Sequence, residues 1–128
     1  MQERVIINIK PEIQGIFEKH HDDIVEAMVL VSKNGIPLTA MTRRSGKNES
    51  FSALTATIYG ASDVVFTSFD KTSPTIIEVN SQNDVLMIKG VGKSMVLALM
   101  GSVSDKNSLE RIMNAVSEEI ENSSSFKK

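Results

Sequence analysis

The sequence predicts one mixed α/β (α+β) domain, in which helices cover both faces of a five-stranded antiparallel sheet. Its 128 residues suit a single domain. Residues 75–100 hold three short apolar runs joined by tight turns, and connections this short allow only antiparallel pairing. Two other stretches, 49–66 and 108–121, carry apolar residues at helical spacing. Burying these stripes favours α/β/α layers with the order helix, two strands, helix, three strands, helix.

The first ten residues lie outside this order. Residues 5–9 form a β-branched run, so residues 1–10 are expected to be an N-terminal arm or an extra strand. Pro11 then suits the first turn of a helix, where its missing N–H costs no hydrogen bond. A first helix is predicted over residues 11–21, because apolar residues follow at roughly helical spacing: Ile13, Ile16, Phe17 and Ile24.

A β-hairpin is predicted next. Residues 27–32 form a nearly continuous apolar run, as expected of a central strand covered on both faces. Lys33-Asn34-Gly35 supplies the turn, because Asn-Gly tolerates the positive φ angles of tight hairpins. Residues 36–41 return as the second strand. Pro37 has no N–H to donate to a ladder, which predicts that this second strand lies at an edge of the sheet.

The long helix, at about residues 49–66, follows Asn48, a residue type that favours the N-cap position. One of its stripes is apolar and is expected to be buried: Phe51, Leu54, Ile58, Ala61 and Val65. A second stripe consists of small side chains, which let another backbone approach closely: Ala53, Ala56, Thr57 and Gly60. The molecule's own sheet and the same helix of a second copy are equally good neighbours for this second stripe.

The C-terminal part is predicted to form strands over 75–80, 84–89 and 95–100, then a helix over 108–121. Asn107, with Glu110 three residues on, resembles a capping box at the start of that helix. Residues 122–128 are expected to form a disordered tail. The helix carries its own apolar stripe: Leu109, Ile112, Met113, Val116 and Ile120.

Composition excludes several classes of function. The net charge is −2, whereas nucleic-acid-binding proteins usually show a strong basic excess on one face. The chain has no cysteine, which excludes disulfides, thiolate zinc sites and thiol nucleophiles. Its apolar runs are too short for the core of a signal peptide or for a membrane span. We therefore expect a cytoplasmic protein that binds no nucleic acid and does not insert into a membrane.

Gly90-Val91-Gly92-Lys93-Ser94 reads like the end of a phosphate-binding P-loop. The full motif needs a further glycine where this chain has Met87, and it must open a helix. Residues 95–100 instead have the pattern of a strand. A glycine-rich β-turn is therefore the better interpretation, and no nucleotide binding is expected.

The remaining chemical motifs are weaker. His20-His21-Asp22-Asp23 suggests a metal site, but adjacent side chains on a helix point in different directions, and no second cluster accompanies them. A solvated helix end is the better interpretation. The serines lack a recognisable catalytic motif, and G-x-S-x-G is absent. We therefore predict no catalytic, metal or cofactor-binding residue, and no enzyme.

The order and spacing of these elements resemble the Roadblock family, which includes the dynein light chain of that name and bacterial activators of Ras-like polarity GTPases. The resemblance covers residues 11–121. It lies in an apolar strand, a turn ending in glycine and a G-[IL]-P-[IL] return, followed by the Ala/Thr/Gly-rich helix and the three-strand meander. The residues that match the strand, turn and return are Ala27-Met28-Val29-Leu30-Val31-Ser32-Lys33-Asn34-Gly35-Ile36-Pro37-Leu38.

This resemblance implies a dimer, formed with a second copy or with a related Roadblock-type subunit. In the family, two sheets join edge to edge along the strand after the middle helix, and the dimer serves as a non-enzymatic platform for a small Ras-like GTPase. Some members accelerate GTP hydrolysis in the partner. The dimer interface is therefore expected at Ala53, Ala56, Gly60, Thr75, Ile77 and Val79.

The GTPase is expected to dock on the outer positions of the middle helix, where Tyr59 would be an aromatic anchor. Closing the dimer seam is the alternative role for this tyrosine. The basic loop that ends at Lys47 would steer an acidic partner, with an ordinary solvated loop as the alternative. The expected partner-binding residues are Tyr59, Ser52, Thr55, Ser62, Arg43 and Arg44.

A second class of function stays open beside the GTPase platform. A ligand-sensing module of profilin-like or PAS-like shape would have a similar α/β/α pattern, and a small enzyme is a weaker alternative. A defined internal pocket and thermal stabilisation by a ligand would indicate the sensor. A filled core and an exposed flat surface would indicate the platform.

Overall fold

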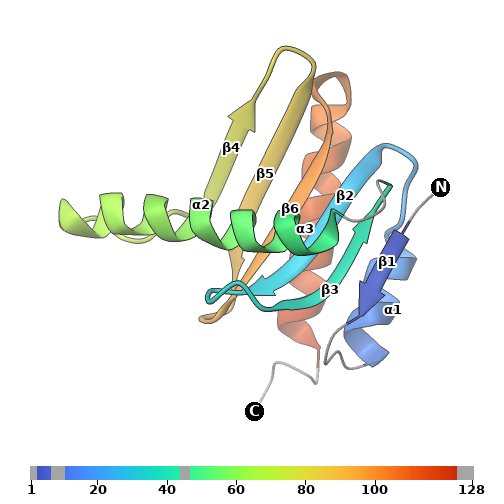
Figure 1. Ribbon diagram of the computed structural model, residues 1–128, viewed down its shortest axis with the longest axis horizontal. Coiled ribbons are helices and arrows are strands. Elements are labelled where there is room, and N and C mark those ends of the chain that lie inside the picture. The colour runs from blue at the N-terminus through green and yellow to red at the C-terminus, as the bar shows by residue number, and fades with distance from the viewer. Residues whose placement is uncertain (1–2, 7–10, 44–46, 124–128) are drawn as a thin grey trace.

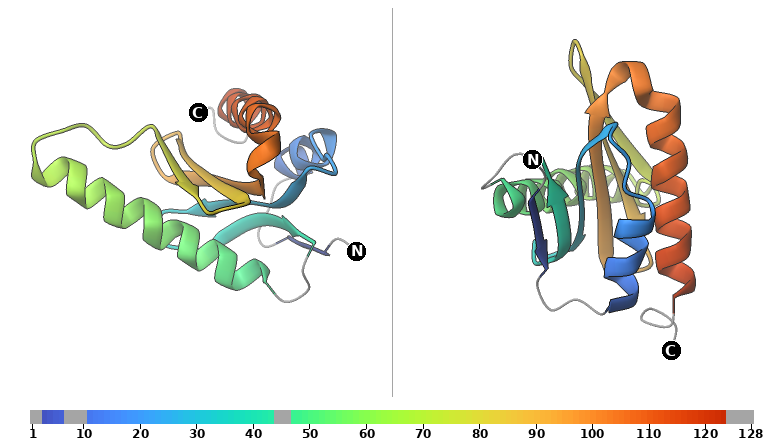
Figure 2. Two further views of the ribbon diagram at one scale, coloured as in Figure 1. Left: turned by 90° about the horizontal axis from the view of Figure 1, so that it is seen from above. Right: turned by 90° about the vertical axis from the view of Figure 1, so that its right-hand side faces the viewer.

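The computed structural model describes residues 3–6, 11–43 and 47–123, which fold into three layers (Figure 1; Figure 2). A six-stranded sheet forms the middle layer. Helix α2 (Asn48–Ser68) crosses one face of the sheet, and helices α1 (Pro11–Lys19) and α3 (Lys106–Asn122) cover the other face. The predicted α/β/α fold and its order of elements are confirmed.

All strand pairs are antiparallel, and the order across the sheet is β1-β3-β2-β6-β5-β4. The central strands β2 and β6 are buried along most of their length, as the apolar run 27–32 predicted. The strands are β1 (Glu3–Ile6), β2 (Val25–Ser32), β3 (Pro37–Thr42), β4 (Ile76–Asn80), β5 (Asp84–Val91) and β6 (Met95–Ser102).

Residues 1–10 were expected to be either an N-terminal arm or an extra strand, and strand β1 shows that part of them is an extra strand. It pairs with β3 from Glu3 opposite Thr42 to Ile6 opposite Thr39. The prediction that β3 is an edge strand is therefore wrong, because β1 covers its outer side. Pro37 lies before the part of β3 that β1 reaches, so its missing N–H removes no hydrogen bond to β1.

The core between the sheet and helices α1 and α3 is built from large apolar side chains. The predicted stripe of α3 is confirmed, since four of its members are no more than 1% exposed and Ile112 packs against the same core. Phe17 of α1 is completely buried beside them. Burying each such side chain stabilises the fold by about 1.5–3 kcal/mol. The four stripe members are Leu109, Met113, Val116 and Ile120.

The core between the sheet and α2 is smaller, and only part of the predicted stripe contributes to it. Phe51 and Ile58 are partly buried and pack against this core. Leu54 is 59% exposed and Val65 is 56% exposed, so the expectation that the stripe faces the core is wrong for these two residues. The physical reason is the close approach of the helix to the β2–β3 turn, where a Cβ on Gly35 would lie 3.9 Å from the Cβ of Ala56. Small side chains fit this approach. The buried residues of α2 are Asn48, Ser52, Thr55, Ala56 and Tyr59.

The helix starts differ from those predicted. The N-cap of α2 is Lys47 and that of α3 is Asp105, and neither side chain caps its helix. A 3-10 helix, η1 (Val103–Asp105), leads directly into α3, so Asn107 lies inside the first turn and no capping box forms. The first helix ends at Lys19.

Candidate functional site

Helix α2 carries a run of exposed apolar side chains. Its C-terminal half extends past β4 at the edge of the sheet (Figure 1). Phe69, just after the helix, is 70% exposed. Val65, Phe66 and Phe69 lie around one shallow hollow, and large exposed apolar side chains that lie together are typical of interaction sites. We call these five residues the α2 apolar surface: Leu54, Val64, Val65, Phe66 and Phe69.

Sequence reasoning missed most of this surface, although a signal was present. Residues 64–66 are consecutive and apolar, and neighbours on a helix are about 100° apart around the axis. They cannot all face one core. When apolar residues occur on more than one side of a helix, the helix is expected to contact a second apolar surface besides the core of its own domain.

Strand β4 ends the sheet next to this surface. It pairs with β5 on one side and has no strand on its other side among the described residues. Ile77 packs against the α2 side of the sheet, and Val79, two residues on, lies on the same face and is 47% exposed. On the opposite face, Lys106 Nζ lies 2.6 Å from Glu78 Oε2 and lowers the pKa of that carboxyl.

Tyr59 lies at the underside of α2 and not on its outer side. Its ring is 5% exposed, and its hydroxyl donates a hydrogen bond of 3.5 Å to the carbonyl of Pro74. Gly90 makes room for it, because a Cβ there would lie 2.9 Å from the hydroxyl oxygen. Burial, and secondarily Asp63, raises the pKa of Tyr59. The Lys33 Nζ atom lies 5.6 Å from the ring centroid, within cation–π range.

The prediction that Tyr59, Ser52 and Thr55 face outward is therefore wrong. Ser52 is fully buried, and its Oγ donates to the carbonyl of Asn48 at 2.8 Å. Thr55 is 1% exposed. Their position follows from the rotation of α2, which turns Ser52, Thr55 and Tyr59 to the sheet and Leu54 and Val65 away from it. Ser62 is half-buried.

The residues predicted for a dimer interface fall in two places. Ala56 is buried against the β2–β3 turn, whereas Ala53 and Gly60 are exposed on α2. Thr75 is exposed just before β4, on the face of the sheet that Ile77 and Val79 share. The α2 and β4 members thus lie on one side of the sheet, and their role in a dimer stays a prediction.

The basic loop is less free than the sequence indicated. Arg43 donates a hydrogen bond to the carbonyl of Asp23, and one of its terminal nitrogens lies 3.7 Å from the Asp23 carboxylate. Its charge is therefore matched within the molecule. Lys47 is exposed, and Arg44 lies outside the described residues.

An open groove of about 380 Å³ lies between the first turns of α2 and one end of the sheet. Its floor comes from β2, β3, β5 and β6, and the side chains at its centre are mostly apolar. The lining residues used below are Ala27, Phe51, Leu54, Met100, Glu26 and Asp84.

The P-loop-like segment is a strand end and a turn, as predicted. Gly90 and Val91 belong to β5, and β6 follows from Met95 with no helix between them. Gly92 has a φ of 62°, a left-handed value that glycine adopts more readily than other residues. Its N–H donates a hydrogen bond to Glu121 Oε2 at 3.0 Å.

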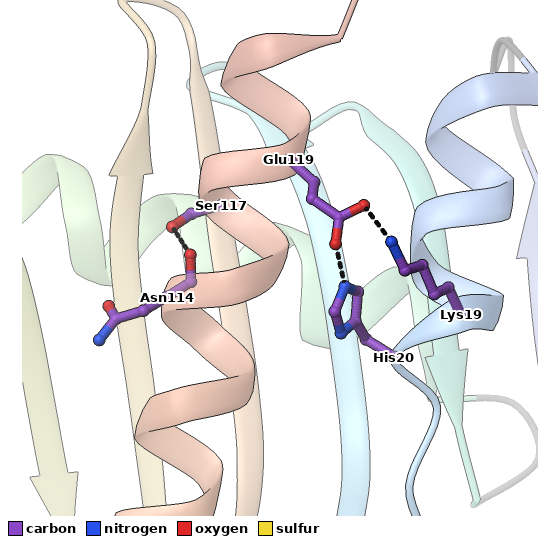
Figure 3. Close-up of polar contacts among 5 residues, drawn as sticks. All are labelled: Lys19, His20, Asn114, Ser117 and Glu119. Carbon is purple, nitrogen blue, oxygen red and sulfur yellow. Dashed lines mark hydrogen bonds and ion pairs between the residues drawn. The ribbon is translucent and has the colours of Figure 1, made fainter.

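The His20 segment joins two helices (Figure 3). The Oε2 atom of Glu119 on α3 contacts His20 Nε2, and its Oε1 atom lies 3.2 Å from Lys19 Nζ. The hydrogen bond from His20, and then that from Lys19, lowers the pKa of Glu119. Close by on α3, the Ser117 hydroxyl donates to the Asn114 carbonyl at 3.1 Å (Figure 3). Within the part of the chain that the structure describes, no group of three or more metal-ligating side chains occurs.

The described helices were also compared with the length and hydropathy that a membrane span requires. None of them is both long enough and apolar enough to cross a bilayer.

Known proteins with this fold share little sequence with the chain. MglB of Myxococcus xanthus superposes with a TM-score of 0.77 at 19% identity, covering 86% of this chain and 92% of that protein. The Roadblock/LC7 domain of Streptomyces avermitilis gives a TM-score of 0.72 at 16% identity, with coverage of 85% and 91%. The gliding protein MglB of Thermus thermophilus gives 0.66 at 12% identity, with coverage of 88% and 90%. These likenesses establish the fold.

Sequence comparison establishes the family. No curated protein matches the chain significantly. The model of the Roadblock/LC7 domain matches residues 21–100, which include the hairpin, α2 and most of the three-strand meander. The chain therefore belongs to the Roadblock/LC7 domain family.

Proposed function

We propose that this protein is a non-enzymatic cytoplasmic regulator that dimerises and binds a small Ras-like GTPase. Membership of the Roadblock/LC7 family supports a role in GTPase regulation. The observation that carries the proposal is the α2 apolar surface beside the free edge of β4. Together they provide the two components of a protein interface, a strand whose outer edge has no neighbouring strand among the described residues and an exposed apolar area.

The dimer is proposed to form by pairing of two β4 strands. This pairing gives partners to the outer N–H and C=O groups of β4, which sheet edges otherwise leave open. Because α2 extends past β4, edge-to-edge pairing would bring its C-terminal half over the sheet of the second copy (Figure 1). Val65 and Phe66 would then be buried against that copy, together with Val79 of β4. A related Roadblock-type subunit with the same edge would fit equally.

The GTPase is proposed to dock on the exposed flank of α2 that carries Ala53 and Gly60, a role different from the dimer contact that the family resemblance implied for these two residues. Ala53 and Gly60 lie on this side, about 100° or more around the helix axis from Leu54 and Val65. They are exposed, and Thr57 between them turns its hydroxyl back to the Ala53 carbonyl at 2.9 Å. The result is a flat surface of small side chains, on which the folded surface of a partner can rest closely.

Gly60 allows a sharp test of this docking surface. Its added Cβ would meet no atom within 4 Å, and the same holds for Gly15 in α1 on the other side of the sheet. Gly60→Glu should therefore keep the fold and abolish GTPase binding, whereas Gly15→Glu should keep both. The measurement is complex formation and GTP hydrolysis for each Ras-like GTPase of the source organism. Failure of every such GTPase to bind or respond to the natural protein would contradict the proposal.

A further inference from the structure

The groove beside the first turns of α2 differs in chemistry from the surfaces assigned above. Ala27 and Met100 form its floor, and Phe51 and Leu54 form its wall. Leu54 is 59% exposed, so the apolar wall opens to solvent along its length. The volume of about 380 Å³ is large enough for one or two bulky side chains of a partner. A groove of this kind gains free energy from an apolar group that fills it.

One end of the groove is acidic. Glu26 and Asp84 line it, and they also line an adjoining hollow of about 550 Å³, where Asp23 and Asp105 lie. Four carboxylates thus follow one another from the apolar floor to the end of the sheet. The cations among the residues that line the groove and the adjoining hollow are Arg43, which is paired with Asp23, and Lys47. Lys106, which follows Asp105 in the chain, is paired with Glu78. Among the described residues, no ion pair satisfies Asp84 or Asp105.

We propose that this groove binds a segment of a partner protein in which a bulky apolar side chain is flanked by lysines or arginines. The apolar side chain would lie on Ala27 and Met100, against Leu54. The flanking cations would reach Asp84 at the rim and Asp105 in the adjoining hollow. Charge complementarity selects this occupant, because an acidic segment would be repelled and a neutral one would leave Asp84 and Asp105 without an ion-pair partner. The partner segment proposed for this groove is positively charged, whereas the basic loop had suggested a negatively charged partner.

This inference goes beyond the proposed GTPase platform and does not depend on it. The platform uses β4, the C-terminal half of α2 and the flank of that helix that carries Ala53 and Gly60, so Leu54 is the one member of the α2 apolar surface that also lines the groove. The groove lies at the N-terminal half, towards the ends of β2 and β6. A protein that binds no GTPase would still be expected to bind a basic, apolar segment here.

The test uses three synthetic peptides and the full chain labelled with ¹⁵N. The first peptide is acetyl-Lys-Lys-Phe-Leu-Lys-Lys-amide. The second replaces its lysines with glutamates, and the third replaces its two apolar residues with serines. Titration followed by amide chemical shifts should show saturable changes at Ala27, Leu54 and Met100 with the first peptide only. Binding of the acidic peptide with equal affinity, or changes confined to other surfaces, would overturn the inference.

Two pairs of variants then test the groove residues. Asp84→Lys should weaken binding of the first peptide about tenfold at low salt, since it replaces an attraction with a repulsion. Its control, Glu110→Lys on exposed α3, should leave binding unchanged. Leu54→Ser should remove binding of the first peptide. Its control, Ile36→Ser, changes an apolar residue that is exposed to a similar degree and should retain binding.

A dilution series distinguishes the other occupants. Without peptide, the amide signals of Ala27 and Met100 should not change with protein concentration. A concentration-dependent change there would show that a second copy fills the groove, and would overturn the inference. Binding of a neutral apolar compound as tightly as the first peptide would overturn it as well, because the carboxylates would then contribute nothing.

Discussion

The two faces of the sheet meet their helices in different ways. Helix α3 presents large apolar side chains, and its four core residues are no more than 1% exposed. Helix α2 presents small and polar ones, and the Thr55 Oγ1 atom beneath it has no hydrogen-bond partner among the described residues. At the same time α2 keeps Leu54, Val65 and Phe66 in contact with solvent.

This difference separates folding from recognition. The side with α1 and α3 buries its apolar residues within one chain, so it supplies most of the hydrophobic stabilisation of the monomer. On the side with α2, the close approach of Ala56 to the β2–β3 turn, the ring of Tyr59 and the partly buried Phe51 and Ile58 hold the helix. Other large apolar side chains of α2, such as Leu54 and Val65, remain exposed. Substitutions should therefore affect stability mainly on the first side and association mainly on the second.

The largest expected effect is truncation in the α3 core. Met113→Ala removes a side chain that is 0% exposed, and such substitutions cost about 2–5 kcal/mol. Leu54→Ala on exposed α2 should change the free energy of unfolding by no more than about 0.5 kcal/mol. Urea unfolding of both variants, at a concentration where the protein is monomeric, measures the contrast. Equal losses in the two variants would contradict the division between the faces.

Two glycines of the sheet sharpen the comparison. A Cβ at Gly101 would lie 2.7 Å from both the Ile24 carbonyl oxygen and Leu109 Cδ1, so backbone and core must move. Gly101→Ala should cost about 1–3 kcal/mol by overpacking. At Gly90 the obstacle is the hydroxyl end of Tyr59, a side chain that can shift. Gly90→Ala should therefore cost less stability than Gly101→Ala. Thermal unfolding of the two variants measures this difference. A larger loss of stability for Gly90→Ala would show that the α2 side is the more tightly packed one.

A smaller effect is expected from the Tyr59 hydroxyl. Tyr59→Phe removes the hydrogen bond to the Pro74 carbonyl and keeps the ring over Gly90, which should cost about 0.5–1.5 kcal/mol. The variant should still form dimers, because the hydroxyl lies beneath the helix. Urea unfolding and sedimentation give the two quantities. Loss of dimerisation without loss of stability would place Tyr59 in the seam after all.

The smallest effect is electrostatic and concerns the contact between α1 and α3. The pKa of Glu119 is below its ordinary value of 4.5 because of His20 and Lys19. Its ionised form therefore stabilises the fold at pH above 4.5, and this contribution is lost as the pH falls through the lowered pKa. Glu119→Gln should be less stable than the natural protein at pH 6, and the difference should shrink towards pH 3. A difference that stays constant with pH would show that the contact contributes nothing through charge.

Much of the fold could be predicted because the relevant signals are local. The apolar run 27–32, the Asn34-Gly35 turn and the stripe of α3 each specify one element, and short connections fix antiparallel pairing. The rotation of α2 could not be predicted in this way. Its apolar stripe has the spacing of a core stripe, but the packing of Ala56 near Gly35 and of Tyr59 over Gly90 leaves Leu54 and Val65 of that stripe exposed.

The candidate site was predicted in part for the same reason. The resemblance to the Roadblock family implied that the strand over residues 75–80 lies at a sheet edge, and β4 is an edge within the described residues. Tyr59 and Ser52 were placed outside because the apolar stripe was assumed to be inside. The neutralisation of Arg43 by Asp23 depends on residues twenty apart in sequence, which no local pattern relates.

The most direct test of the account is the mass of the protein in solution, measured by light scattering at micromolar concentration. We expect twice the chain mass of 14.0 kDa for the natural protein, and the monomer mass for Val65→Glu. The control Gly15→Glu, at an exposed position of α1 on the other face of the sheet, should remain a dimer. A natural protein that measures 14.0 kDa, or a Val65→Glu variant that keeps the dimer mass, would contradict the assignment of α2 and β4 as the dimer interface.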